Sequence, residues 1–200
     1  MRSSTSPIRV AASVAAVVAL CACASAPTTR YYTLLAAAPP PKAGPSAMLI
    51  EVLPVRVPAQ VDVQELVVRQ GGGELARVEA AQWIAPLPDE WRAALSAQLQ
   101  ARLGARDVYG LPQEQAAPVR RVRLVVHRYD AWLDHRVDVA AHWSVSDVSG
   151  ARITCDSRAI ENIPAGIAGI VDGYQRALAR IAAEIATVLS RPPGAAVVCP

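Results

Sequence analysis

The spacing of apolar side chains predicts two helices, each with one buried face. Near the end of the chain, apolar residues recur every three or four positions, which places them on one face of a helix over residues 167–190. These residues are Tyr174, Leu178, Ile181, Ile185 and Leu189. A second stripe, Trp91, Leu95, Leu99 and Leu103, predicts a helix over residues 88–104, which Pro88, Asp89 and Glu90 open and Gly104 ends.

Alternation of apolar and polar residues predicts strands in the remaining segments. It is clearest at Val137, Val139, Ala141, Trp143 and Val145. Strands expected over residues 119–132 and 153–160 flank this segment, and turn residues separate the three, so we predict an antiparallel meander. Upstream, residues 66–78 predict a β-hairpin whose turn is the glycine run 71–73. No Lys-Ser/Thr pair follows these glycines, so they favour a turn over a phosphate loop.

Two further strands are expected nearer the N-terminus. Residues 31–35 read as a first strand, and a second over residues 48–58 carries Pro54 and Pro58, which cannot donate to a ladder and must lie at an edge or break the strand. Together the elements predict an α/β (α+β) fold: a single domain with a mixed, largely antiparallel sheet and two long amphipathic helices packed on it.

The first residues have the pattern of an export signal. Arg2 and Arg9 precede an unbroken run of eleven small or apolar residues, 10–20. A membrane-spanning helix needs about 20 such residues, whereas a signal peptide needs roughly 7–15, so we expect cleavage. We therefore predict a signal peptide over residues 1–22, a lipidated cysteine and proline-rich tether with a first short strand over 23–46, a globular domain over 47–191 and a tail over 192–200.

The cleavage site has the lipobox pattern, with Leu20 at −3, Ala22 at −1 and Cys23 at +1. Cys23 is the predicted lipidation site, because Cys21 would put the large Leu20 at −1. Each buried methylene contributes about 0.8 kcal/mol, so palmitate-type acyl chains on one cysteine form a lasting anchor. Ala24 at +2 favours the periplasmic face of the outer membrane. An ordinary secretory peptide with a soluble product is the alternative.

Two cysteines, Cys155 and Cys199, remain in the exported chain. In an oxidising compartment a leftover pair is expected to form a disulfide, which would fasten the tail to the body. Neither cysteine lies in the sequence context of a catalytic nucleophile.

Charge excludes one class of function. The 200-residue chain is 52% hydrophobic and carries 20 basic and 17 acidic residues. Loss of Arg2 and Arg9 with the leader leaves 18 basic and 17 acidic residues, a net charge of +1. A chain without a basic patch or run lacks the electrostatic footprint of a nucleic-acid-binding protein.

Candidate catalytic groups are sparse, and we expect no cofactor and no enzyme activity. If Asp134 and His135 form a two-residue turn, His127 and His142 lie directly opposite each other, but two histidines do not make a zinc site. Asp130 would face the other side of a regular strand.

Ser144 and Ser146 lie in an ordinary strand without a Gly-x-Ser-x-Gly elbow, and Asp89 and Glu90 suit a helix start better than an acid–base dyad. Trp83 is open to interpretation as a lid, a staple or a partner contact.

Several motifs behind the lipobox together carry a family resemblance. They are YYTL at 31–34, PVRVP at 54–58, ELVVR at 65–69 and WIAPL at 83–87. In this order the chain resembles the PqiC-type family of ABC-transport auxiliary lipoproteins. At residues 59–64, where that family more often carries Tyr-Leu-Asp-Arg-Pro, only Asp62 matches.

The resemblance implies a non-enzymatic docking subunit of a Mce-type lipid-transport system that spans the periplasm and supports envelope integrity. Its partner would be the Mce-domain protein of the inner-membrane ABC transporter, and the subunit itself could form a homo-oligomer. Two alternatives stay open at this point: a lipid-anchored periplasmic hydrolase, and an assembly lipoprotein for an outer-membrane β-barrel.

Overall fold

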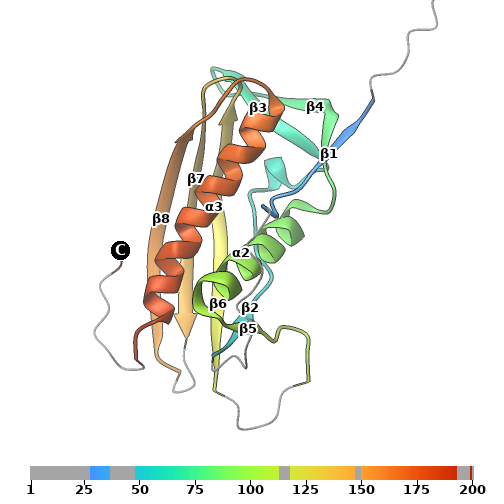
Figure 1. Ribbon diagram of the computed structural model, residues 1–200. Helices are drawn as coiled ribbons and strands as arrows, with labels where there is room; N and C mark the ends of the chain where they lie inside the picture. The colour runs from blue at the N-terminus through green and yellow to red at the C-terminus, as the bar shows by residue number, and fades with distance from the viewer. Residues whose placement is uncertain (1–27, 37–47, 113–117, 147–149, 193–198, 200) are drawn as a thin grey trace, which may run out of the picture.

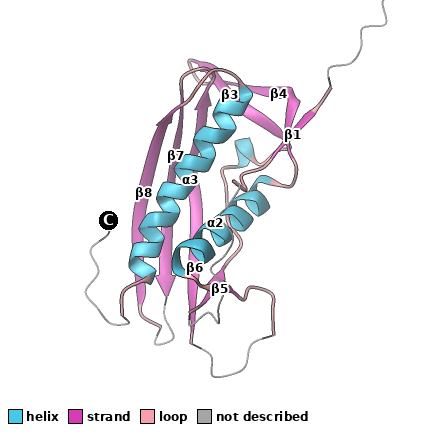
Figure 2. Cartoon of the chain, in the orientation of Figure 1, coloured by secondary structure: helices cyan, strands magenta, loops and turns pink. Residues whose placement is uncertain are grey.

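Two helices lie across one face of a long sheet, and a smaller sheet stands beside one end of it (Figures 1 and 2). The computed structural model describes residues 28–36, 48–112, 118–146, 150–192 and 199. The elements in chain order are β1 (Arg30–Tyr32), β2 (Leu49–Val52), η1 (Ala59–Val61), β3 (Glu65–Gly71), β4 (Glu74–Trp83), α2 (Leu87–Leu103), β5 (Arg106–Asp107), β6 (Val119–Trp132), β7 (Arg136–Ser146), β8 (Arg152–Asn162) and α3 (Ile167–Leu189).

The long sheet has the strand order β5-β2-β6-β7-β8. Its larger part is the meander that the alternation predicts, because β7 pairs antiparallel with both β6 and β8. Strand β2 runs parallel to β6 and carries the two-residue β5 on its other side. All five apolar side chains of β7 that were expected to face the core are buried.

The smaller sheet has the order β1-β4-β3 and corrects the expectation of one continuous sheet. The predicted hairpin forms, and Gly71, Gly72 and Gly73 all have positive φ, which favours glycine in this turn. The prolines end the regular pairing of β2 in the long sheet. Strand β2 ends at Val52, just before Pro54, and beyond it the contacts with β6 are a hydrogen bond from the Leu53 amide to the Val122 carbonyl oxygen and an isolated bridge between Arg56 and Val125.

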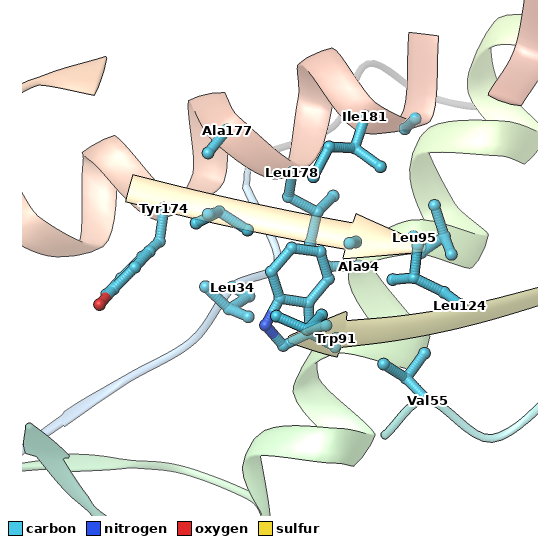
Figure 3. Close-up of a cluster of buried hydrophobic side chains, with 14 of the residues drawn as sticks. Leu34, Val55, Trp91, Ala94, Leu95, Leu124, Tyr174, Ala177, Leu178 and Ile181 are labelled. Atoms are coloured by element: carbon cyan, nitrogen blue, oxygen red, sulfur yellow. The ribbon is translucent and has the colours of Figure 1, made fainter. Parts of the chain in front are cut away.

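Both helices have the bounds that the apolar spacing predicts, within two residues at each end. Helix α2 ends where Gly104 adopts a left-handed conformation, φ 61°. Between α2, α3 and the long sheet, Trp91 and Leu95 meet Tyr174, Leu178 and Ile181 (Figure 3). Burial of each such side chain contributes roughly 1.5–3 kcal/mol, so this cluster holds the layers together. The predicted α+β class with two sheet-packed helices is confirmed.

Helix α3 lies unusually close to β7 at one glycine. A Cβ atom on Gly173 would lie 2.5 Å from Cγ2 of Ile163 and 3.0 Å from Cγ2 of Val137. Because that space is already filled, a side chain at position 173 would push the helix away from the sheet.

Candidate functional site

One end of the molecule receives the N-terminal segment, and several elements meet there. Thr28 and Arg30 line a groove of about 330 Å³ together with the first residues of α3, Ile167 and Ala168. The Gly166 amide, just before α3, donates a 2.7 Å hydrogen bond to Asp134 in the β6–β7 turn. We call this the tethered end, after the lipid tether predicted at Cys23. Cys23 lies outside the described residues, five positions before Thr28.

A second contact at the tethered end joins the two sheets. Arg69, near the end of β3, forms an ion pair with Asp130, near the end of β6, with 2.6 Å between Nε and Oδ1. The β3–β4 hairpin turn therefore lies near the β6–β7 turn, as Figure 1 also shows. Four parts of the chain meet at this end and are linked through these contacts: the N-terminal segment, the start of α3, the β6–β7 turn and the β3–β4 hairpin.

Glu90 is buried and holds the segment that follows β1. Its carboxylate accepts a 2.6 Å hydrogen bond from the Thr33 hydroxyl and a 2.7 Å bond from the Leu34 amide. On the other side, the Gln175 side-chain amide donates to the Thr33 carbonyl oxygen at 3.0 Å. The N-terminal segment is thereby fixed to both helices. Glu90 lies in the first turn of α2, as expected of a helix-start charge, but its contacts with residues 33 and 34 were not foreseen.

Three buried aromatic rings pack together near the segment that Glu90 and Gln175 hold. Tyr129 and Tyr174 are parallel, with 3.9 Å between ring centroids, and Trp83 packs against Tyr174 at 6.4 Å. Trp83 is buried in the core, so of its three interpretations neither a lid nor an exposed partner contact fits. Burial, and secondarily the neighbouring tyrosine, raises the pKa of Tyr129, and burial raises the pKa of Tyr174. Both hydroxyls therefore stay protonated at neutral pH.

The outer face of the long sheet carries two buried aspartates. Asp130 and Asp138 are direct partners on β6 and β7. Arg128 lies 2.8 Å from Asp130 (Nη1 to Oδ2), and Arg158 binds both oxygens of Asp138 at 2.9 and 2.6 Å. Hydrogen bonding to Asp138 raises the pKa of Arg158. Asp130 is thus neutralised by Arg128 on its own strand and by Arg69 on β3, and Asp138 by Arg158 on the neighbouring strand β8.

The histidine pair meets, but in a different register from the one expected. The turn leaves three residues between Trp132 and Arg136, and a bulge at His127 shifts the ladder again, so His142 pairs with Val125. The rings of His127 and His142 still stack, with 4.1 Å between centroids. The same bulge corrects the expectation for Asp130, which shares the outer face with both histidines.

The histidine pair has one carboxylate neighbour. Nδ1 of His142 contacts the Asp156 carboxylate on β8. Partial burial, followed by the charge of His142, lowers the pKa of His127 below its ordinary value of 6.5. Among the described residues, no three His, Cys, Asp or Glu side chains gather closely enough to hold a metal ion. Ser144 and Ser146 lie in strand β7.

Cys155 and Cys199 are joined in a disulfide, with 5.6 Å between their Cα atoms. Cys155 is buried on β8, the last strand of the long sheet, so the bond fastens position 199 to this edge. Sγ of Cys199 also lies 3.4 Å from the carbonyl oxygen of Thr154.

These features define a two-helix α+β domain in which arginines pair with the buried Asp130 and Asp138, and neutral donors bind the buried Glu90. None of its described helices is long and apolar enough to cross a membrane. The chain belongs to the family of ABC-type transport auxiliary lipoprotein components, whose model matches residues 32–186. This membership confirms the family resemblance seen in the motifs. A lipoprotein family implies a membrane-anchored location, and the family name implies association with an ABC transporter.

Solved structures share the fold. An uncharacterised protein superimposes with a TM-score of 0.67 at 19% identity, over 82% of this chain and 99% of its own. A Xanthomonas campestris protein of the DUF330 family superimposes with a TM-score of 0.57 at 15% identity, over 78% of this chain and 92% of its own. No curated protein matches the chain in sequence.

Proposed function

We propose that this protein is an outer-membrane lipoprotein that serves as the docking subunit of a Mce-type ABC lipid-transport system and so supports envelope integrity. The observation that carries the proposal is the family match over residues 32–186, which makes the chain an auxiliary component of an ABC transporter. The role is binding, not catalysis. The clamped N-terminal segment, the paired charges and the protonated tyrosines are consistent with a rigid docking body.

Cys23 is the proposed anchor, exposed by removal of a signal peptide over residues 1–22. Thr28 lies five positions after Cys23, a distance of at most about 18 Å when the chain is extended. Acyl chains on Cys23 would keep the tethered end next to the bilayer, and Ala24 favours the outer membrane.

The shape of the domain supports a docking role. Strand β6 has 14 residues, and at about 3.3 Å per residue it spans roughly 45 Å. The end opposite the tether, where β5 and the end of α3 lie, would therefore face the periplasm. There it would receive the Mce-domain protein anchored in the inner membrane, with several copies of the domain arranged around that partner.

Purification from native membranes tests this proposal. The protein is extracted in mild detergent through a tag, and its companions are identified by mass spectrometry. We expect a Mce-domain protein and subunits of an ABC transporter. A solitary protein, under conditions that preserve a known envelope complex, would contradict the docking role.

Substitution of the anchor tests the localisation. Cys23→Ser should move the protein from the membrane fraction to the soluble periplasm and abolish function, while the domain stays folded. Cys21→Ser, two positions upstream in the leader, is the matched control and should leave the protein in the membrane fraction. Retention of Cys23→Ser in membranes would overturn the assignment of Cys23.

A further inference from the structure

Three large apolar side chains are exposed at the tethered end, although they come from three separate elements. Tyr31 on β1 is 59% exposed, Leu75 at the start of β4 is 38% exposed, and Leu133 in the β6–β7 turn is 48% exposed. Leu75 pairs with Arg69, whose guanidinium reaches Asp130, three positions before Leu133. Tyr31 directly follows Arg30, which lines the groove beside the start of α3.

We propose that Tyr31, Leu75 and Leu133 form a membrane-docking surface that seats the tethered end of the domain on the lipid bilayer. The inference rests on the proposed anchor at Cys23. The length of the preceding segment identifies the occupant: with at most about 18 Å between Cys23 and Thr28, this end cannot move far from the bilayer surface.

The chemistry of the three side chains fits an interface between lipid and water. Tyrosine combines an apolar ring with a hydroxyl that stays hydrated, and such residues concentrate at the headgroup level of membranes. Leu75 is the second residue of β4, next to the glycine turn, and Leu133 lies within the β6–β7 turn, so both lie at strand ends. Docking would hold the domain with its long axis pointing away from the bilayer. The lipid anchor would then limit the distance between the domain and the bilayer, and these side chains would set the orientation of the domain.

The opposite end provides a matched control. Leu111 is 47% exposed, nearly the same as Leu133, and belongs to the segment after β5. The Val108 amide donates to the Ile50 carbonyl oxygen, which places this segment beside β2 at the far end of the long sheet. Leu111 therefore shares residue type and exposure with Leu133 and differs in its distance from the tether.

The experiment compares these two leucines in the full-length lipidated protein. Leu133→Cys and Leu111→Cys are each labelled with a polarity-sensitive maleimide fluorophore, since Cys155 and Cys199 are bonded to each other. The proteins are reconstituted into vesicles of phosphatidylethanolamine and phosphatidylglycerol, with and without a lipid that carries a shallow nitroxide. We expect blue-shifted emission and several-fold stronger quenching at position 133 than at position 111.

A second variant tests whether the surface acts as a unit. Tyr31→Ser combined with Leu75→Ser should reduce the quenching at position 133 while the protein still floats with the vesicles. Equal quenching at positions 133 and 111 in floating protein overturns the docking surface alone. A wild-type protein that does not float with vesicles overturns the anchor at Cys23 as well.

Discussion

On strand β7, Val139 and Trp143 face the helices, whereas Asp138 and His142 face the opposite side of the sheet. Asp138 is as well buried as the apolar residues beside it. Apolar packing under α2 and α3 accounts for the burial on the inner face, and arginines from neighbouring strands account for it at Asp138. The comparison teaches that one strand can reach the same burial by two mechanisms, which should respond differently to substitution and to pH.

Substitutions on the inner face should lower the free energy of unfolding more than substitutions on the outer face. Leu178→Asp on α3 would remove a buried leucine and place an unpaired carboxylate among apolar side chains, lowering the free energy of unfolding by at least about 4 kcal/mol. Thr187→Asn, on the exposed side of the same helix, should change it by less than about 0.5 kcal/mol. Urea denaturation measures both. An unchanged midpoint for Leu178→Asp would mean that this helix face is not the core.

Loss of the disulfide at the edge of the long sheet should lower the free energy of unfolding by nearly as much as Leu178→Asp. It closes a loop with a sequence separation of 44, for which chain entropy gives about 4 kcal/mol. Combined Cys155→Ala and Cys199→Ala should lower the free energy of unfolding by about 2–4 kcal/mol. Reduction of the wild-type protein should have a similar effect and should leave the alanine variant unaffected. A thiol-labelling count of two in non-reduced native protein would contradict the bond.

The outer face should show a smaller loss when its charge pairing is broken. Asp138→Ala leaves Arg158 without its partner, whereas Arg128 keeps its ion pair with Asp130. Because the Arg158 guanidinium can reach water, we expect a loss of about 1–3 kcal/mol. Asp156→Ala, on the exposed part of the same face, should cost less than about 0.5 kcal/mol. Equal losses for the two variants in urea denaturation would show that the arginine cover of Asp138 does not contribute to stability.

The smallest effect is a pH dependence confined to the outer face. Because the folded-state pKa of His127 lies below its ordinary value, the unfolded chain takes up the proton first as pH falls. Stability is therefore fully present above about pH 6.5 and declines below it. Between about pH 7.5 and about pH 5, His127→Gln should lose less stability than the wild type. The control Thr187→Asn, which changes no titratable group, should follow the wild-type pH profile, and identical profiles for all three proteins would refute the assignment.

The elements that the sequence predicts best are those with a local signal. The alternation in β7, the stripe in α3 and the glycine after α2 each depend on neighbouring residues, and the structure has them where expected. The histidine register was wrong because a three-residue turn and a bulge are tertiary adjustments that alternation does not encode. The hydrogen bonds of Glu90 to Thr33 and Leu34 were not predicted, because these partners lie 57 and 56 positions away in the sequence.

By itself the sequence determined the two amphipathic helices, the meander and the two cysteines left for a bridge, whereas the leader with its lipobox stays a prediction. Periodicity, turn chemistry and composition act over a few residues, so they can be seen without coordinates. Only the tertiary structure decided the division into two sheets, the burial of Asp130 and Asp138 under arginines, and the placement of Tyr31, Leu75 and Leu133 on elements of one end. Those features depend on which distant segments meet, and no local pattern specifies that choice.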